Sequence, residues 1–507
     1  MKNQKKSLLI VGGGTAGWLS AAIIAAYHRE RSQDDFTIGL VEAADIPTVG
    51  VGEGTWPTLR NTMRSIGIDE KTLFKTCFAG FKQGGKFVNW ASEQDAYYHP
   101  FTVPLGYGNI DLAPYMDDIR SFATQSNYQQ EVCEAGLAPR SLDEGEYQGI
   151  CNYAYHLDAG AFADLLKKHC RDVLGVQHHI GTVKDVKLGD DGHIQSLDLE
   201  RDGEPFSLEA DLFIDCTGFR SLLLGGALDV PFKSLDDILY NDSALAIRVP
   251  YADDHDPMAP YTIATGQNAG WIWDIGLTNR RGVGHVYSSQ YLSEDEAAAN
   301  LSTYIGQPLD GFDVKKINFR SGYREVAWKN NCVGIGLAMG FVEPLEATAI
   351  MLVEVAARYV AEHVFGDRAV MEISAKRFNQ HMDYRWQRIA DFLKLHYMLT
   401  KREEPYWKAH TDESSIPLSL KEDLMVWRNR GPINSDFEGV AELFPAASYQ
   451  YVLYGMGFRP EYDQQAYLYN QRGQAERIKE KNRALTSQLL RDLPPHRRYI
   501  EHWLSAH

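Results

Sequence analysis

The stretch that decides the fold lies near the start of the chain and reads Ser7-Leu8-Leu9-Ile10-Val11-Gly12-Gly13-Gly14-Thr15-Ala16-Gly17. Residues 7–11 form a short apolar run, which is typical of a parallel strand buried on both faces. The glycines that follow fit the pattern Gly-x-Gly-x-x-Gly, and residues 18–28 are predicted to form a helix. In this pattern the first glycine permits a tight turn, the second lets backbone amides approach a pyrophosphate, and the third lets the helix pack closely on the strand.

The segment after the helix completes a nucleotide-binding unit. Residues 36–41 are predicted to form a second strand, and Glu42 at its end can accept a hydrogen bond from a ribose hydroxyl. We therefore expect a bound dinucleotide here, the alternative being a glycine-rich turn without a ligand. No second pattern of this kind is found. Pro57 interrupts the segment after residues 50–54, where a helix should follow. After Gly334 and Gly336 the next glycine, Gly340, comes one residue too late for Gly-x-Gly-x-x-Gly. One dinucleotide is predicted, and it must be reduced elsewhere.

The remaining patterns predict a mixed α/β protein with a helical C-terminal part. Helices are expected at residues 155–169 and 345–365, a hairpin broken at residues 190–192 within 183–199, buried strands at 211–215 and 332–337, and an antiparallel sheet over 244–287. An amphipathic helix is indicated by Phe378, Met382, Trp386, Ile389, Leu393 and Tyr397. The predicted domains are residues 1–370, a Rossmann-like module with an inserted antiparallel sheet at about 231–320, and residues 371–507, a mainly helical module packed on it.

Composition excludes several classes of protein. The 507 residues include 44% hydrophobic and 23% charged side chains, which excludes a disordered, collagen-like or multi-span membrane protein. Lys and Arg number 51 against 68 Asp and Glu, a net charge of -17. This negative net charge does not attract polyanions such as nucleic acid or a surface of anionic lipid, so neither is an expected partner.

Cysteine usage and the N-terminal segment point to the cytoplasm. The six cysteines are dispersed without a Cys-x-x-Cys pair or a His cluster at zinc spacing, so no metal site is predicted. Residues 1–27 have the basic start and apolar run of a signal peptide, the alternative interpretation. The glycines between residues 12 and 17 favour a strand-to-helix turn instead.

Several motifs together identify a family. Residues 208–218 form an apolar strand ending in Thr217-Gly218, which resembles a segment that FAD-dependent oxidoreductases place beside their cofactor. The chain resembles the flavin-dependent tryptophan halogenases, most clearly from Leu8 to about Arg358. The stretches that carry this resemblance are Gly12 to Trp18, Gly52-Glu53-Gly54-Thr55-Trp56-Pro57, Phe81-Lys82, Gly270-Trp271-Ile272-Trp273-Asp274-Ile275 and Gly340-Phe341-Val342-Glu343-Pro344-Leu345-Glu346-Ala347-Thr348.

The resemblance implies a reaction and two catalytic residues. In this family reduced FAD, O2 and chloride or bromide yield hypohalous acid, which passes through a tunnel to a lysine and halogenates an electron-rich aromatic such as an indole or a tryptophan derivative. Lys82 matches the lysine, whose ammonium can donate to hypohalous acid or whose neutral amine can take the halogen. Glu346 matches a carboxylate that removes the ring proton or polarises hypohalous acid. A separate NAD(P)H-dependent flavin reductase is implied as a partner, and a homodimer is one option for the assembly.

The resemblance also assigns the binding positions. Thr348 and Ala349 match the halide amides, and we expect the helix after Pro344 to begin late enough to leave these amides free. His99 and Phe101 match positions that sandwich the substrate, and Trp271 and Trp273, on one face of a strand, match the tunnel. The residues assigned to FAD are Gly12, Gly13, Gly14, Thr15, Ala16, Gly17, Glu42, Val51, Val183, Leu337 and Ile350.

Two departures from the family pattern affect the site. Gly276 stands where the motif Trp-x-Trp-x-Ile-Pro has proline, which loosens a rigid turn. Ala349 stands where the family's Glu-Ser-Thr-Gly has glycine. If that backbone needs a positive φ, the amide is aimed less well at chloride, which predicts a preference for bromide. If Ala349 is ordinary helix, its methyl group changes nothing.

Other interpretations remain open from the residues alone. Lys82 could be a solvated surface charge, and Glu346 an acid in the first turn of a helix. His99 could be a loop histidine whose hydrogen bonds are made within the protein, and the two tryptophans could be core aromatics. A flavin monooxygenase that hydroxylates its substrate is the first rival function, and a flavin-binding protein without turnover is the second. The identity of the aromatic substrate, the position halogenated, the preferred halide and the oligomeric state do not follow from the sequence.

Overall fold

The computed structural model describes residues 6–29, 36–44, 52–253, 255–364, 367–437, 439, 442–462, 467 and 469–506. The chain forms two compact units. Unit 1 comprises Met1–Ala79, Leu157–Ser234 and Arg320–Trp386, and unit 2 comprises Gly80–His156, Leu235–Phe319 and Gln387–His507. This division differs from the proposed domain boundary at residue 370, because each unit draws on three separate segments of the chain. The two units are described separately below.

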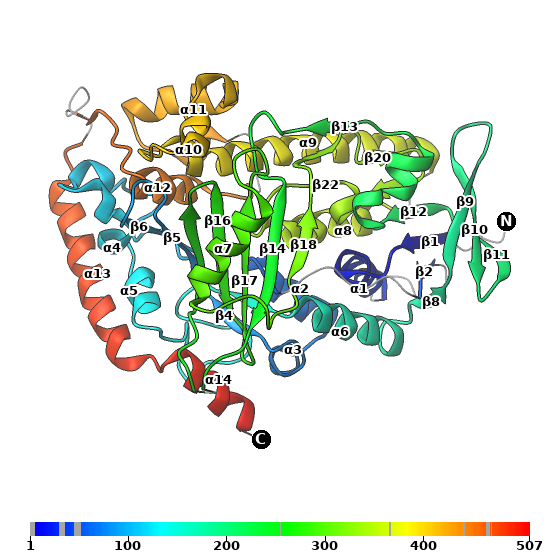
Figure 1. Cartoon of the computed structure of the whole chain (residues 1–507), viewed down its shortest axis with the longest axis horizontal. Coiled ribbons are helices and arrows are strands. Elements are labelled where there is room, and N and C mark those ends of the chain that lie inside the picture. Colours follow the sequence, from blue (N-terminus) through cyan, green and yellow to red (C-terminus); the bar gives the residue numbers. More distant parts are fainter. Residues whose placement is uncertain are drawn as a thin grey trace. The chain divides into compact units, whose positions relative to one another are not determined.

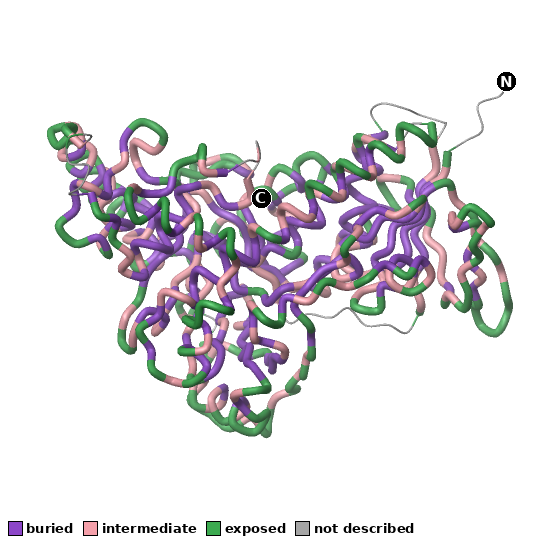
Figure 2. Tube along the Cα trace, turned by 90° about the horizontal axis from the view of Figure 1, so that it is seen from above, coloured by how far each residue is buried: buried purple, intermediate pink, exposed green. Residues whose placement is uncertain are grey.

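Unit 1 is built on the predicted βαβ unit. Strand β1 (Lys6–Val11), helix α1 (Thr15–Arg29) and strand β2 (Phe36–Glu42) confirm the elements expected from the apolar runs and the glycine turn. Strand β1 runs parallel to β2 and to β12 (Leu212–Asp215), in a six-stranded sheet of order β20-β21-β12-β1-β2-β8. The apolar runs of the three central strands, residues 8–11, 38–41 and 212–215, are buried, and buried residues are purple in Figure 2.

Helices cover this sheet, and smaller sheets flank it. Helix α1 packs against α6 (Ala159–Asp172) and α8 (Thr348–His363), and Figure 1 shows α1 beside β1 and β2. The other elements of unit 1 are β3 (Glu53–Gly54), α2 (Thr58–Ile66), α3 (Glu70–Cys77), β8 (Gln177–Ile180), β9 (Thr182–Leu188), β10 (Ile194–Arg201), β11 (Glu204–Glu209), β13 (Phe232–Ser234), β19 (Gly322–Arg324), β20 (Trp328–Lys329), β21 (Cys332–Gly334) and β22 (Gly340–Phe341). The predicted hairpin is confirmed as β9 and β10, which pair antiparallel.

Unit 2 contains the predicted antiparallel sheet. Its seven strands have the order β18-β14-β17-β16-β15-β5-β6, and every neighbouring pair is antiparallel except β15 with β5. The strands and helices of the unit up to residue 319 are β4 (Gly80–Lys82), β5 (Gly84–Val88), β6 (Ala96–Pro100), α4 (Phe122–Ser126), α5 (Gln129–Glu134), β7 (Ala154–Leu157), β14 (Ser243–Val249), β15 (Thr262–Gln267), β16 (Gly270–Gly276), β17 (Arg281–Tyr287), α7 (Glu294–Ile305) and β18 (Lys315–Asn318).

The C-terminal part is helical, as predicted. Helix α9 (Arg368–Met398) carries the apolar residues of the predicted amphipathic helix, and all six of these side chains are buried. The later helices are α10 (Pro405–His410), α11 (Leu418–Asn429), α12 (Ala446–Gly455), α13 (Arg472–Asp492) and α14 (His496–Ser505). Within the described ranges, none of the helices has the length and apolar character needed to cross a membrane.

Three boundaries in the structure differ from the residue ranges expected. The helix expected from Tyr155 begins at Ala159, because Asp158 caps it by accepting from the amide of Ala161 at 2.9 Å, while Tyr155 lies in β7. The helix expected from residue 345 begins at Thr348. The strand expected over residues 332–337 ends at Gly334, and Gly336, at φ 68°, starts a short 3-10 turn.

A buried carboxylate links two helices of unit 1. Glu354 on α8 is 4% exposed and accepts hydrogen bonds from the hydroxyls of Thr58, at 2.9 Å, and Thr62 on α2. Burial raises the pKa of Glu354 to about 7, against the opposing effect of the two hydroxyls. An acid with a raised pKa stabilises the fold below its unfolded value, and this contribution is lost as pH rises through the folded value.

We therefore expect the unfolding free energy to fall by roughly 2–3 kcal/mol between pH 5 and pH 8 through this group alone. Glu354→Gln removes the titration, so its stability relative to the native chain should improve by that amount over the same range. Urea unfolding at several pH values measures the effect, and Glu362→Gln, an exposed change on the same helix, is the control. Parallel pH profiles for Glu354→Gln and the unmodified chain would refute the assignment.

Candidate active site

The glycine turn of unit 1 is shaped by close backbone approaches. Gly12 has φ 116°, and a Cβ there would overlap the carbonyl of Cys216, which follows strand β12. A Cβ on Gly17 would overlap the carbonyl of Gly12, so this glycine lets α1 begin tightly against the turn. A Cβ on Gly14 would meet no atom of the described residues within 4 Å. The turn therefore leaves open space beside Gly14, at the amino end of α1, where amides attract an anion.

Glu42 lies next to this turn with its carboxylate held in place. Its Oε1 accepts from Nζ of Lys167 at 2.6 Å and pairs with Nε2 of His178 at 2.8 Å. Its Oε2 lies where a Cβ of Gly13 would be. One carboxylate oxygen thus faces the glycine turn, as acceptance of a ribose hydroxyl requires.

This arrangement fits a dinucleotide such as FAD. The turn supplies amides and open space for a pyrophosphate, and Glu42 supplies the ribose acceptor. Five of the other residues assigned to FAD lie on described elements. Thr15 and Ala16 begin α1, and Val183 lies on β9. Leu337 lies in the 3-10 turn and Ile350 in the first turn of α8, whereas Val51 lies outside the described residues.

Glu346 lies in the turn before α8, also in unit 1. Its side chain is 7% exposed, and its backbone carbonyl accepts from the indole N–H of Trp56 at 2.7 Å. This bond joins two of the stretches that carry the family resemblance, residues 52–57 and 340–348. This bond could not be predicted from the sequence, because the two residues are separated by 290 positions.

The start of α8 corrects the expectation about Ala349. The residue at positive φ is Ala347, at φ 54° and ψ 41°, and it is the N-cap. Ala349 is an exposed residue in the first turn of the helix. The reason given for a bromide preference is therefore wrong, because the backbone at Ala349 is ordinary helix. As expected, the helix begins late enough to place the amides of Thr348 and Ala349 in its first turn, where they have no acceptor within the helix.

Lys82 lies in unit 2 on the three-residue strand β4. Its side chain is 5% exposed, which excludes a solvated surface charge. Its Nζ lies 5.3 Å from the centre of the Phe101 ring, over the face of the ring. Phe101 follows β6, and its amide donates to the carbonyl of Gln83 at 3.1 Å. The hairpin of β5 and β6 thus holds Phe101 beside the residue that follows Lys82.

His99 belongs to the same hairpin. It is buried, and its Nε2 lies 2.9 Å from the hydroxyl of Ser448 on α12. Its ring meets Phe392 edge to face at 5.7 Å. His99, Phe101 and Lys82 therefore belong to one neighbourhood within unit 2. Glu346, Thr348, Ala349 and the residues assigned to FAD belong to unit 1.

A buried histidine that no sequence motif indicated lies near Lys82. His156 on β7 pairs with Gly80 on β4, and its Nε2 lies 2.8 Å from the hydroxyl of Thr262. Burial and the neighbouring Lys82 hold the pKa of His156 well below its ordinary value. No local motif distinguishes this histidine, so only the pairing of β4 with β7 could identify it.

The two tryptophans of the paired motif lie on β16 as predicted. Trp271 is buried and Trp273 half-buried, and their rings meet edge to face at 6.4 Å, which confirms that both side chains leave the same face of the strand. Gly276 ends this strand. A Cβ on Gly276 would lie 2.5 Å from Cγ of Met258 and 3.2 Å from the hydroxyl of Tyr251. Met258 thus occupies the space that a larger residue at position 276 would need.

We expect Gly276→Ala, which adds only this Cβ, to destabilise the protein by about 1–3 kcal/mol through overpacking. Met258→Ala should relieve the overlap, so the double variant should lose less stability than the sum of the single losses. Urea unfolding of the four proteins gives the coupling. Additive losses would show that Met258 and position 276 do not compete for space.

The part of the chain that the structure describes has no candidate set of metal ligands. No group of three His, Cys, Asp or Glu side chains there gathers closely enough to hold a metal ion.

Comparison with known proteins assigns the family. The tryptophan halogenase family model matches residues 7–471. Tryptophan 7-halogenase RebH from Lentzea aerocolonigenes is 32% identical over 495 residues, covering 91% of this chain and 91% of that enzyme. Tryptophan 6-halogenase SttH from Streptomyces toxytricini is 35% identical over 475 residues, covering 89% of each.

Solved structures agree with this assignment. The crystal structure of tryptophan halogenase from Shewanella frigidimarina NCIMB 400 has a TM-score of 0.93 and 40% sequence identity, covering 99% of this chain and 98% of that chain. Tar14, a tryptophan C-6 flavin-dependent halogenase from taromycin biosynthesis, has a TM-score of 0.91 and 33% identity, covering 99% and 100%. These likenesses confirm the mixed α/β fold and the resemblance drawn from the motifs. The chain belongs to the tryptophan halogenase family and is a flavin-dependent halogenase.

Proposed function

We propose that this enzyme uses reduced FAD, O2 and chloride or bromide to form hypohalous acid, and that it halogenates an indole or a tryptophan derivative. The observation that carries the proposal is the burial of Lys82 on β4 with its ammonium over the ring of Phe101. A lysine buried among aromatic side chains is costly to desolvate, so such a position favours a functional role over a structural one.

Unit 1 supplies the cofactor and halide positions. The turn from Gly12 to Gly17 would hold the pyrophosphate of FAD, and Glu42 would accept from its ribose. Bound reduced FAD would supply two of the four electrons that reduce O2, with the halide supplying the other two. The first-turn amides of Thr348 and Ala349 would bind the halide at the start of α8, where the helix dipole favours an anion.

Lys82 and the aromatic residues of unit 2 would act on the oxidant and the substrate. The ammonium of Lys82 can donate a hydrogen bond to hypohalous acid, or its neutral amine can take the halogen, and both routes deliver an electrophile to an aromatic ring. His99 and Phe101 would hold that ring beside Lys82, which limits its approach to one direction. Glu346 would take the ring proton that leaves as aromaticity returns.

We propose that the enzyme works in the cytoplasm, together with a separate enzyme that reduces the flavin. All six cysteines are buried and free, which fits the reducing cytoplasm. Because the sequence carries one dinucleotide fingerprint, we propose that a separate NAD(P)H-dependent reductase supplies the reduced flavin. The substrate is proposed to be a small aromatic molecule.

Product mass tests the proposed function. The enzyme is incubated with reduced FAD from a flavin reductase, O2, and bromide or chloride, together with a panel of indoles, tryptophan and phenols. A product with the halogen isotope pattern is expected. A gain of one oxygen without a halogen would identify a hydroxylase, and halide-independent consumption of reduced FAD without product would identify a flavin-binding protein that performs no halogenation.

The backbone at the start of α8 predicts how the halide ratio responds to mutation. Ala349→Gly should leave the ratio of brominated to chlorinated product unchanged in competition assays, because Ala349 already has helical backbone. Ala347→Gly should stabilise the fold by about 1 kcal/mol, because glycine adopts the left-handed conformation of residue 347 without strain. In the competition assay with Ala349→Gly, an altered ratio of brominated to chlorinated product would contradict the helical geometry of Ala349.

A further inference from the structure

Strand β4 is held on both of its edges, and Lys82 lies between the holding points. On one edge β4 pairs with β7, with Lys82 opposite Ala154. On the other edge two amides flank Lys82: the amide of Phe81 donates to Nε2 of His496 at 3.0 Å, and the amide of Gln83 donates to the carbonyl of Pro260 at 2.7 Å. A strand of three residues has few other bonds that fix its position.

His496 bridges β4 to the loop that also holds Gln83. Its Nδ1 lies 2.9 Å from the carbonyl of Met258, two residues before Pro260. An amide N–H only donates and a carbonyl only accepts, so the imidazole must be neutral, with its proton on Nδ1. The ring therefore connects the amide of Phe81 to the carbonyl of Met258, as a direct backbone hydrogen bond does between two paired strands.

The surroundings of His496 fix its ring. The side chain is 1% exposed, and the ring lies 5.8 Å from that of Phe81. Its own amide donates to the carbonyl of Gly136 at 2.8 Å, and the neighbouring Arg497 donates to the carbonyl of Thr278 at 2.9 Å. Burial lowers the pKa of His496 to about 4, so the neutral form that the bridge requires persists at neutral pH.

We propose that His496 is a positioning residue for Lys82, acting through the amide of Phe81 on the strand that carries the lysine. This inference rests on the proposed function, in which Lys82 handles the oxidant. Without the bridge, β4 would keep its bonds to β7 but would lose one of the two anchors on its other edge. A displacement of Lys82 by a fraction of an ångström would misdirect the halogen, because a well-oriented reaction depends steeply on geometry.

Replacing His496 by side chains of different length distinguishes a positioning role from a packing role. Gln is long enough to place an oxygen where Nε2 of His496 lies, so His496→Gln can still accept from Phe81. Asn reaches only the position of Nδ1, so His496→Asn leaves that amide without its acceptor. His496→Phe keeps the ring volume and removes both bonds.

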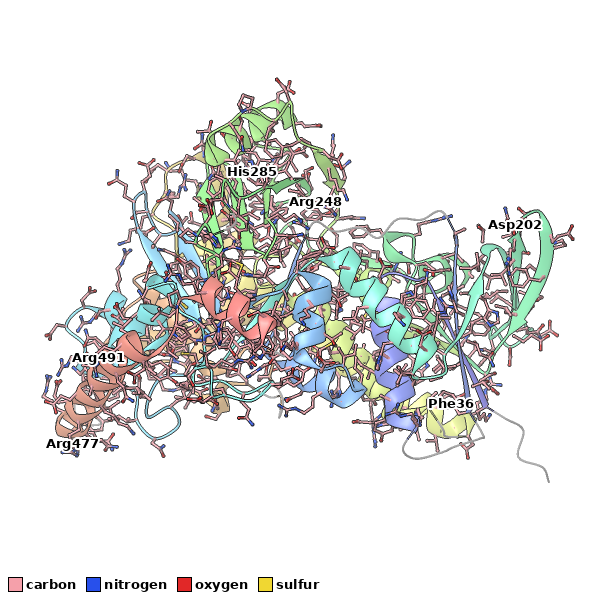
Figure 3. The ribbon with its side chains drawn as sticks, turned by 90° about the horizontal axis from the view of Figure 1, so that it is seen from below. Phe36, Asp202, Arg248, His285, Arg477 and Arg491 are labelled. Atoms are coloured by element: carbon pink, nitrogen blue, oxygen red, sulfur yellow. The ribbon has the colours of Figure 1, made fainter. Side chains whose placement is uncertain are left out.

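A matched control comes from another buried histidine of unit 2. His285 on β17, labelled in Figure 3, is fully buried, and burial also lowers its pKa to about 4. It pairs with Ile272 on β16, so its side chain lies on the face opposite Trp271 and Trp273. His285→Phe therefore measures the general cost of replacing a buried neutral histidine by phenylalanine.

The measurements are the kcat and KM for halogenation, the halide-dependent consumption of reduced FAD, and the hypohalous acid that escapes to a phenol added as a trap. We expect His496→Asn and His496→Phe to lower kcat on the order of 10-fold or more. The KM for the aromatic should change little, trapped oxidant should increase, and His496→Gln should recover most of the activity. A purely structural role would instead lower the amount of folded enzyme without changing the kcat of the folded fraction.

The inference is overturned if His496→Asn equals His496→Gln in kcat, or if His496→Phe loses no more activity than His285→Phe. The comparison of Asn with Gln decides the question even if the Phe variant does not fold. Failure of the proposed function has a different signature, because the unmodified enzyme itself would then yield no halogenated product.

Discussion

Replacing Lys82 by Met is expected to abolish halogenation, lowering the rate by at least about 100-fold, while FAD binding stays unchanged. The lysine lies on β4 in unit 2, whereas the residues assigned to FAD lie in unit 1. Methionine keeps most of the apolar stem and removes the charged end, so the packing against Phe101 is largely preserved. Loss of a group that acts on the reacting atoms typically costs two to four orders of magnitude in rate.

The stability of this variant should not fall, because removing a buried charge also removes its desolvation cost. Product formation by mass detection and flavin titration test the prediction together. Lys86→Met on the neighbouring strand β5 is the control, since Lys86 pairs with Glu134 at 2.8 Å and is more exposed. Halogenation by Lys82→Met at a rate near that of the unmodified enzyme would remove Lys82 from the proposed mechanism.

Replacing Gly12 by Val is expected to eliminate FAD binding. Gly12 has φ 116°, which a β-branched residue adopts only under strain, and its Cβ would overlap the carbonyl of Cys216. Relief of that overlap would move the turn away from β12 and would disturb the space for a pyrophosphate. Because this substitution also destabilises the fold, a second variant is needed to separate cofactor binding from folding.

Gly14→Val provides that variant. A Cβ on Gly14 meets nothing within 4 Å in the part of the chain that the structure describes, so the protein should keep its melting temperature while the side chain fills the space assigned to the pyrophosphate. We expect FAD affinity to fall by at least about 100-fold, comparable to losing several charge-assisted hydrogen bonds. The matched control is Gly311→Val, at an exposed position of unit 2 where a Cβ also meets no atom of a described residue within 4 Å. Normal flavin titration by Gly14→Val would place the cofactor elsewhere.

The parts of the fold that were predicted correctly are those encoded within short windows of sequence. The apolar run of β1, the glycines from Gly12 to Gly17 and the second strand ending at Glu42 lie within one short segment, and each signal acts through its immediate neighbours. The same holds for the periodic apolar residues of α9 and for the hairpin of β9 and β10. The errors fall at boundaries such as the one at Tyr155, where a cap or a strand partner decides between two local conformations.

The candidate site residues were assigned through motifs rather than through geometry. The sequence identified Lys82 and Glu346 only through a family pattern, since one lysine and one glutamate carry no local signal of their own. Of the two alternatives for Ala349, the structure has ordinary helix, and the positive φ lies at Ala347. Its position depends on how the turn from Pro344 packs, including the bond from Trp56 to the carbonyl of Glu346.

The sequence by itself determined that this protein binds a dinucleotide in a βαβ unit and belongs with the flavin-dependent halogenases, because glycine turns, strand periodicity and linear motifs are local. Only the tertiary structure decided that Lys82 is buried, that Met258 fills the space beside Gly276, and that His496 holds the strand of Lys82 across 415 positions of sequence. Such contacts join residues whose local sequences do not refer to each other. They are selected by the packing of whole strands and helices, which no short window contains.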